Sequence, residues 1–195
     1  TCRKFDHIYG SYIFTWNRQK ALDLKTAYGK NAIIGGTGVD VLKKLPDEIE
    51  ILKPDYDLFN LDYGVGFTRR GCINNCKFCV VPQKEKWEED SSISDIINSK
   101  SNSIYLLDNN FANDPNFKEK VEEINDRKLI VNLQSGIDVR TIDDEKSYLL
   151  STMNHEKSLH IAWDNIKHEK SVMKGIESLT KYTKPSKLMC YVLIG

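Results

Sequence analysis

The chain lacks long apolar runs, an excess of either charge and an even set of cysteines. Its 195 residues contain 28 Lys and Arg against 28 Asp and Glu, so the formal net charge is zero. A neutral balance leaves no electrostatic footprint for nucleic acid or for an anionic membrane. No stretch reaches the ~18 consecutive apolar residues of a membrane span. The composition therefore argues against a nucleic-acid-binding protein and against a membrane protein.

A secretory signal and an initiator Met are also missing from the sequence, which begins Thr1-Cys2-Arg3. Its last residues, 192–195, continue an apolar run whose strand edge would be left uncovered. We therefore expect a chain truncated at both ends. Three of the five cysteines fall within eight residues. A secreted disulfide framework normally has an even count, whereas this odd, clustered set indicates metal chemistry in the cytoplasm.

From about residue 66 onward, apolar strand-like runs alternate with amphipathic helical ones. The last four strands begin at 103, 130, 158 and 187, a regular spacing that matches one βα unit. Repeated parallel βα units with crossovers of similar length predict an α/β fold, a partial (β/α) barrel of the TIM type. The predicted strands are 66–70, 103–108, 130–135, 158–164 and 187–195, and the predicted helices are 92–100, 116–127, 143–151 and 168–182.

Residues 1–62 have a different pattern. Strands are predicted at 8–14 and 31–34, with a helix at 17–28 between them, and the second strand runs into a glycine-rich turn at 35–38. This segment is too short for a complete doubly wound domain. We expect two domains, an incomplete Rossmann-like segment at 1–62 and a partial barrel at 63–195.

The cysteine cluster has the spacing C-x3-C-x2-C, formed by Cys72, Cys76 and Cys79, directly after the first predicted barrel strand. Barrels of this class place their chemistry on such loops. Three thiolates cannot fill a four-coordinate site, and a cubane iron–sulfur cluster normally takes four cysteines. Three ligands would leave one iron open, as catalysis requires. The alternatives are a fourth ligand from Cys190 or a histidine, and a structural zinc site.

The pattern C-x3-C-x-aromatic-C, with Phe78 in the aromatic position, resembles the radical S-adenosylmethionine (SAM) superfamily. Residues 67–82 look like the branch that carries a cobalamin-binding-type domain before the barrel, and residues 33–38 resemble the glycine-rich strand end of that domain. The resemblance implies a [4Fe–4S] cluster on the three cysteines and SAM on the fourth iron. Reductive cleavage of SAM would then yield a 5′-deoxyadenosyl radical that acts on an unknown substrate, with electrons from a flavodoxin-like or ferredoxin-like donor.

The same resemblance implies that SAM contacts follow successive strands. Asp108 stands where the family binds the SAM amino group, but it could instead cap a turn. Arg140 could clamp the SAM carboxylate or pair with Asp138 or the aspartates at 143 and 144. Asp164 could accept the ribose hydroxyls or cap the next helix. The full set of implied cofactor-binding residues is Phe78, Asp108, Asn109, Gln134, Arg140, Asp164 and Ile194.

Cobalamin itself is not expected. The lower-ligand signature of such domains is Asp-x-His-x-x-Gly, whereas residues 5–10 read Phe-Asp-His-Ile-Tyr-Gly, with the Asp one position late. Two other functions remain open. One is a tRNA methylthiotransferase-like enzyme, which would normally bring a basic RNA-binding appendage that this sequence does not show. The other is a non-catalytic iron–sulfur or zinc structural module.

Overall fold

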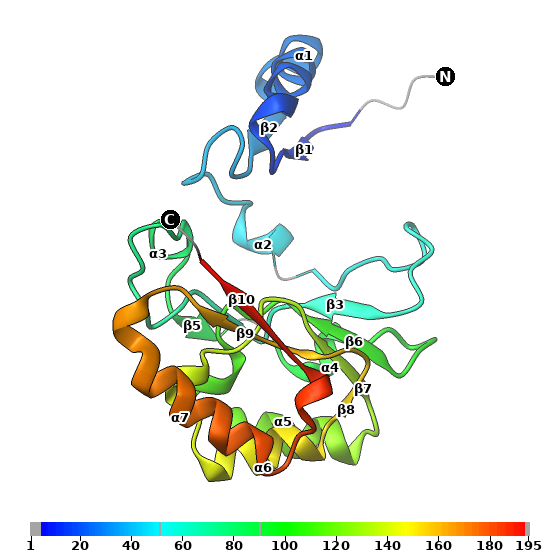
Figure 1. Ribbon diagram of the computed structural model, residues 1–195. Coiled ribbons are helices and arrows are strands. Elements are labelled where there is room, and N and C mark those ends of the chain that lie inside the picture. Colours follow the sequence, from blue (N-terminus) through cyan, green and yellow to red (C-terminus); the bar gives the residue numbers. More distant parts are fainter. Residues whose placement is uncertain (1–4, 51, 90, 194–195) are drawn as a thin grey trace. The chain divides into compact units, whose positions relative to one another are not determined.

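The computed structural model describes residues 5–50, 52–89 and 91–193 (Figure 1), with only the backbone of Glu89. The chain divides into two compact units, Thr1–Leu52 and Lys53–Gly195. The boundary expected from the sequence, at residue 62, lies further along the chain, inside the second unit. No helix among the described residues has the length and apolar character needed to cross a bilayer.

The first unit is one βαβ motif. Strands β1 (Ile8–Ser11) and β2 (Ala32–Gly35) pair in parallel, and helix α1 (Arg18–Tyr28) connects them. Ala21, Ala32 and Ile34 form its small buried core. The predicted glycine turn is confirmed: Gly36 has φ +98°, and a Cβ there would stand 2.6 Å from the Tyr12 carbonyl oxygen. The short segments η1 (Thr15–Asn17), η2 (Gly29–Asn31) and α2 (Asp47–Glu50) complete the unit.

The second unit is built on parallel strands. A four-stranded sheet has the order β3 (Gly64–Gly66), β6 (Ser103–Leu106), β7 (Ile130–Leu133), β8 (Asn154–His155). A second parallel pair consists of β9 (Leu159–Trp163) and β10 (Leu188–Val192). A parallel bridge between Ile137 and Ile161 connects the segment after β7 to β9. Neighbouring strands therefore follow the order of the chain.

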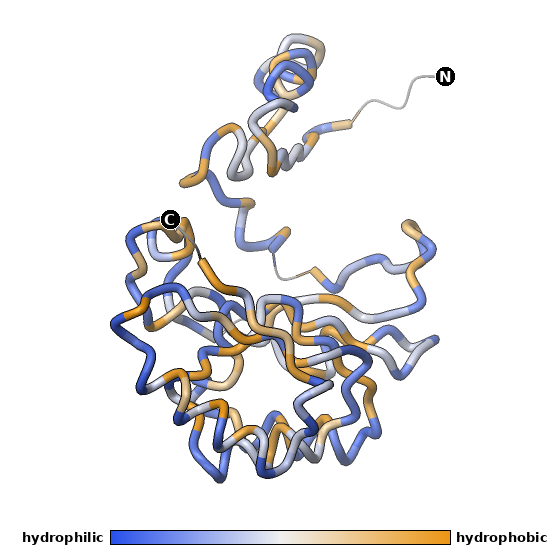
Figure 2. Tube along the Cα trace, in the orientation of Figure 1, coloured by the Kyte–Doolittle hydropathy of each residue, from blue (hydrophilic) through white to orange (hydrophobic). Residues whose placement is uncertain are grey.

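Helices α5 (Phe117–Asp126), α6 (Asp144–Thr152) and α7 (Glu169–Thr180) lie along one side of these strands (Figure 1). Hydrophilic and hydrophobic residues both occur along these helices (Figure 2), and α5 and α7 each bury an apolar face, which in α5 includes Val121 and Ile124. The helix predicted at 168–182 is confirmed by α7, where Val172 and Leu179 are fully buried. The remaining short elements are α3 (Val81–Lys84), α4 (Ile93–Ile96), η3 (Phe111–Asn113), η4 (Val139–Thr141), η5 (Ile166–His168) and η6 (Pro185–Lys187).

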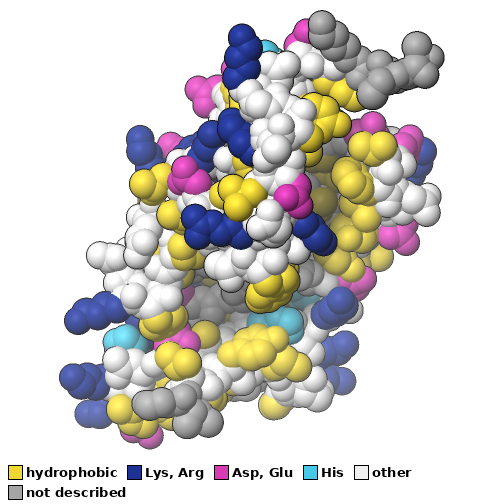
Figure 3. Space-filling model, turned by 90° about the horizontal axis from the view of Figure 1, so that it is seen from above, with side chains coloured by type: hydrophobic (Ala, Val, Ile, Leu, Met, Phe, Trp, Pro, Cys, Tyr) yellow, Lys and Arg dark blue, Asp and Glu magenta, His cyan; other side chains and the backbone are white. Residues whose placement is uncertain are grey.

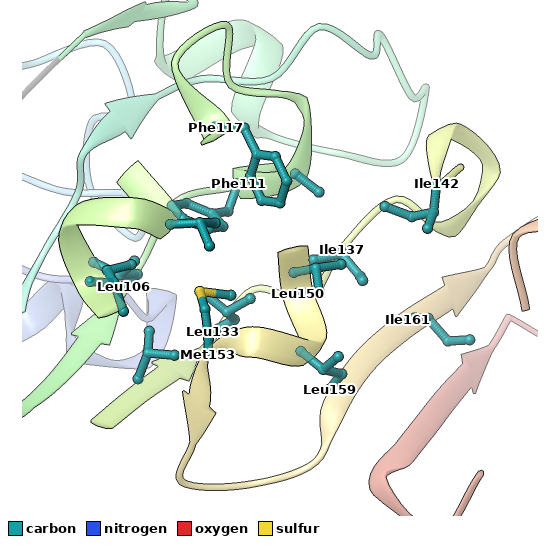
Figure 4. Packing of buried hydrophobic residues seen from close by; sticks show 14 of the residues in the cluster. Leu106, Phe111, Phe117, Leu133, Ile137, Ile142, Leu150, Met153, Leu159 and Ile161 are labelled. Carbon is teal, nitrogen blue, oxygen red and sulfur yellow. The ribbon is translucent and has the colours of Figure 1, made fainter. Parts of the chain in front are cut away.

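The core of the second unit lies between the strands and these helices. Alternate strand residues such as Ile104 and Leu106 point into it, and Phe111 and Phe117 meet edge to face above them (Figure 4). At the surface, charged side chains of both signs are interspersed with hydrophobic ones on the face drawn in Figure 3, in keeping with the neutral charge balance.

The mixed α/β class with parallel sheets is confirmed, but the described strands form no closed barrel. Two element predictions are wrong in detail. The strand at 66–70 is broken into β3 and the two-residue β4 (Arg69–Arg70), which pairs antiparallel with β5 (Glu88–Glu89). The break falls where the Asp108 carboxylate accepts hydrogen bonds from the backbone N–H groups of Thr68 and Arg69. The helix at 92–100 is the single turn α4, begun by a capping box between Ser92 and Asp95.

Candidate cofactor site at the cysteine loop

The three clustered cysteines lie on residues 71–80, the cysteine loop, which leaves the end of β4. Gly71 makes the turn into the loop with φ +76°, and a Cβ at this position would overlap the backbone carbonyl of Lys86. The Gly71 N–H donates to Glu85 Oε2 at 3.2 Å, and Asn109 Nδ2 donates to the same oxygen at 3.0 Å. A glycine is therefore required where the loop begins.

Cys72, Cys76 and Cys79 are free thiols, each partly buried. The Cys79 N–H donates to the Cys76 carbonyl oxygen at 3.0 Å, so the last two share a tight turn. Among the described residues, no group of three His, Cys, Asp or Glu side chains is gathered as metal ligands. The donor set fits an iron–sulfur group in kind and number, because thiolates are its usual protein ligands.

Charged and titratable groups surround the Cys76 thiol. Burial raises the pKa of Cys76, the neighbouring Arg140 lowers it, and Cys79, Cys72 and Asp164 raise it. These groups come from the loop, from η4 and from the end of β9. Two of the sequence-predicted cofactor residues, Arg140 and Asp164, are therefore brought into electrostatic reach of the cysteines.

Arg140 is held in a fixed orientation. Its Nε and Nη2 donate to the two oxygens of Asp138 at 2.7 and 2.6 Å, and its Nη1 lies 3.1 Å from His168 Nδ1, which must act as acceptor. A guanidinium has five N–H groups, so one remains on each terminal nitrogen. The pairing with Asp138 that the sequence left open is confirmed. Burial raises the pKa of Asp138, but hydrogen bonds from Arg140 and Asn74 outweigh it and lower the pKa.

Asp164 is exposed, and its carboxylate has no hydrogen-bond partner among the described residues. The alternative role as a helix cap is wrong, because the side chain of the next residue, Asn165, accepts the Lys167 N–H and caps η5. Asp164 therefore combines an uncommitted carboxylate with a position near Cys76 and Arg140.

Asp108 is only 4% exposed and is already committed to the protein. It accepts from the Thr68 N–H at 2.6 Å, from the Thr68 hydroxyl and from the Arg69 N–H at 3.2 Å. Burial raises the pKa of Asp108 to about 6, against the opposing effect of the Thr68 hydrogen bonds. The structure places this carboxylate beneath the β3–β4 connection, in the role of an anchor.

The other predicted residues fall in different surroundings. Phe78 is 64% exposed on the cysteine loop, and Gln134 is exposed after β7. Ile194 lies outside the described residues. Sequence reasoning missed Asn110, whose Nδ2 lies 3.5 Å from Cys72 Sγ, and Asn74, which donates to Asp138 at 2.8 Å. Both asparagines lie near residues that the sequence did single out, but no sequence signal indicates which side chain each asparagine contacts.

Comparisons with protein-family models, with curated proteins and with solved structures found no match to this chain.

Proposed function

We propose that this chain is the cluster-binding part of a radical SAM enzyme. The observation that carries the proposal is the set of three free thiols in C-x3-C-x-Phe-C spacing on one loop that follows β3 and β4. Three thiolates from one loop suit a cubane cluster with an open iron. When bound, the cluster supplies the electron that cleaves SAM to methionine and a 5′-deoxyadenosyl radical.

The residues around the loop suit the charged ends of SAM. Arg140 keeps N–H groups on both terminal nitrogens for a carboxylate, and Asp164 offers free oxygens for an ammonium or for ribose hydroxyls. Both stand within electrostatic reach of Cys76. The protein would bind and orient SAM there.

The topology supports the same assignment. The cysteine loop follows β3 and β4, residues 108–110 follow β6, residues 138–140 follow β7, and Asp164 follows β9. Carboxyl ends of parallel strands meet at one edge of a sheet, where barrel enzymes keep their chemistry. We propose that the strands from β3 to β10 are part of a radical SAM barrel and that the βαβ unit is a cobalamin-binding-type segment that no longer binds cobalamin.

The test is anaerobic reconstitution with iron and sulfide, reduction, and electron paramagnetic resonance with and without SAM. We expect a [4Fe–4S]⁺ signal that changes shape when SAM is added. Methionine and 5′-deoxyadenosine would then be sought after addition of a flavodoxin or ferredoxin system. A signal that SAM leaves unchanged would overturn the assignment of an open iron. Stoichiometric zinc without any cluster signal would support a structural module instead, and a corrinoid absorption spectrum would contradict the loss of cobalamin.

A further inference from the structure

Asp138 connects the middle of the cysteine loop to the core of the second unit. Asn74, between Cys72 and Cys76, donates to Asp138 Oδ2 at 2.8 Å. The same oxygen accepts from Arg140 Nη2 at 2.6 Å, and Asp138 Oδ1 accepts from the Arg140 backbone N–H at 3.2 Å. Only 9% of the Asp138 side chain is exposed. The bond to Asn74 is therefore charge-assisted and largely shielded from water.

The two ends of this connection differ in rigidity. Asp138 caps η4, whose Val139 is fully buried. Helix α7 packs so closely on η4 that a Cβ at Gly175 would overlap the Val139 carbonyl oxygen. The loop, by contrast, carries exposed apolar side chains, with Ile73 at 52% and Phe78 at 64%. The packed segment η4 therefore fixes the position of the cysteine loop.

The neighbouring Asn75 provides a natural contrast. It is the same residue type, also lies between Cys72 and Cys76, and is exposed. Its side chain has no hydrogen-bond partner among the described residues. The connection to Asp138 therefore depends on Asn74 specifically and not on the amide-rich character of the loop.

We propose that Asp138 is a positioning residue that docks the cysteine loop through Asn74 while it orients Arg140, so that the cluster ligands and the Arg140 cation share one support. That this support serves a cluster and SAM rests on the proposed function, but the docking of the loop by Asp138 is a property of the metal-free chain. The two can therefore be tested separately.

The first experiment measures how fast iodoacetamide labels each thiol of the reduced, metal-free chain, with peptides resolved by mass spectrometry. Asn74→Ala removes the connection without changing any charge, and Asn75→Ala is its matched control. Loss of a hydrogen bond to a charged group should raise labelling of Cys72 and Cys76 about tenfold. Asn75→Ala should label like the unchanged chain, and Cys190, exposed on β10, is the internal reference.

A second variant keeps the test decisive if Asn74→Ala folds poorly. Asp138→Asn should accelerate labelling of the same two thiols and leave Cys190 unchanged. The docking role is overturned if Asn74→Ala labels at the rate of the unchanged chain, or if Asn75→Ala accelerates labelling equally.

The second experiment concerns the cluster. After reconstitution, Asn74→Ala should lose iron to a chelator about tenfold faster than Asn75→Ala. The g-values of its reduced cluster should also shift, which a general loss of stability would not cause. Equal rates and equal g-values would overturn the shared support. If no variant, including the unchanged chain, takes up iron, the proposed function fails, while the labelling result still decides the docking.

Discussion

Arg140 and Asp164 both act electrostatically on the Cys76 thiol. Under the proposed function, Cys76→Ala leaves two thiolates, too few to hold a cubane. We expect iron to fall from about four per chain to almost none after reconstitution, measured by metal analysis. Cys190→Ala is the control, because Cys190 is exposed on β10 and should be dispensable. About four irons in Cys76→Ala would remove it from the ligand set.

Asp164 is the carboxylate near the loop that has no partner among the described residues. Asp164→Ala should weaken SAM binding by about 10- to 100-fold, the cost of losing a hydrogen bond to a charged group. The cluster spectrum without SAM should not change. Calorimetric titration of the reconstituted chain measures the affinity. Asp144→Ala is the control, since that side chain pairs with Lys181 at the surface. Equal SAM affinity in both variants would exclude Asp164 from the site.

Asp108 has a pKa raised to about 6 in the folded chain, from the ordinary 3.8. Because the folded state holds this proton more tightly, the group favours folding below about pH 4. This contribution to the free energy of unfolding decreases as the pH rises to about 6 and is constant above that pH. The total decrease is at most about 3 kcal/mol. Asp108→Asn cannot titrate, and its amide would face the donating Arg69 N–H.

Urea unfolding of both forms between about pH 4.5 and 7.5, a range that brackets the Asp108 pKa of about 6, separates the contribution of this carboxyl group from those of all other titrating groups. The free energy of unfolding of the unchanged chain, minus that of Asp108→Asn, should decline up to about pH 6 and stay constant above it. A difference that rises with pH over this window would contradict the raised pKa.

At the scale of elements, close packing of α7 on η4 positions both Asp138 and Arg140. Gly175→Ala places a methyl group against the Val139 carbonyl, so we expect a loss of about 1–3 kcal/mol in the free energy of unfolding. It should also speed labelling of Cys76, because η4 supports the loop. Lys174→Ala, on the exposed side of the same helix, should change stability by less than about 0.5 kcal/mol. Equal effects of the two substitutions would contradict the close approach.

The sequence predicted elements well where periodicity governs them and poorly where side chains redirect the backbone. Helix α7 was predictable because Val172, Ile176 and Leu179 recur on one face. The break after β3 was not, because it depends on hydrogen bonds from Thr68 and Arg69 to Asp108, some 40 residues away. Local pattern carries no information on such a distant partner.

At the scale of the molecule, the order of the strands explains how much of the candidate site could be predicted. Successive parallel strands end at one edge, so the sequence predicts that the residues after the strands 66–70, 103–108, 130–135 and 158–164 lie close together. Arg140 and Asp164 do reach Cys76 electrostatically. The roles of Asn74 and Asn110 could not be foreseen, because amides at loop positions have many equivalent partners and only packing selects one.

The proposed binding of SAM to the cluster predicts that SAM stabilises the whole second unit. If SAM binds through an open iron, at 100 times its dissociation constant it should add about 2.7 kcal/mol to the unfolding free energy of the reconstituted chain. Amides of β6 and β7 that exchange only on global opening should then exchange about 100-fold more slowly with deuterium. The metal-free chain should show no such protection, because the iron that chelates SAM is missing. Equal protection with and without the cluster would mean that SAM binds this fold independently of the cysteines.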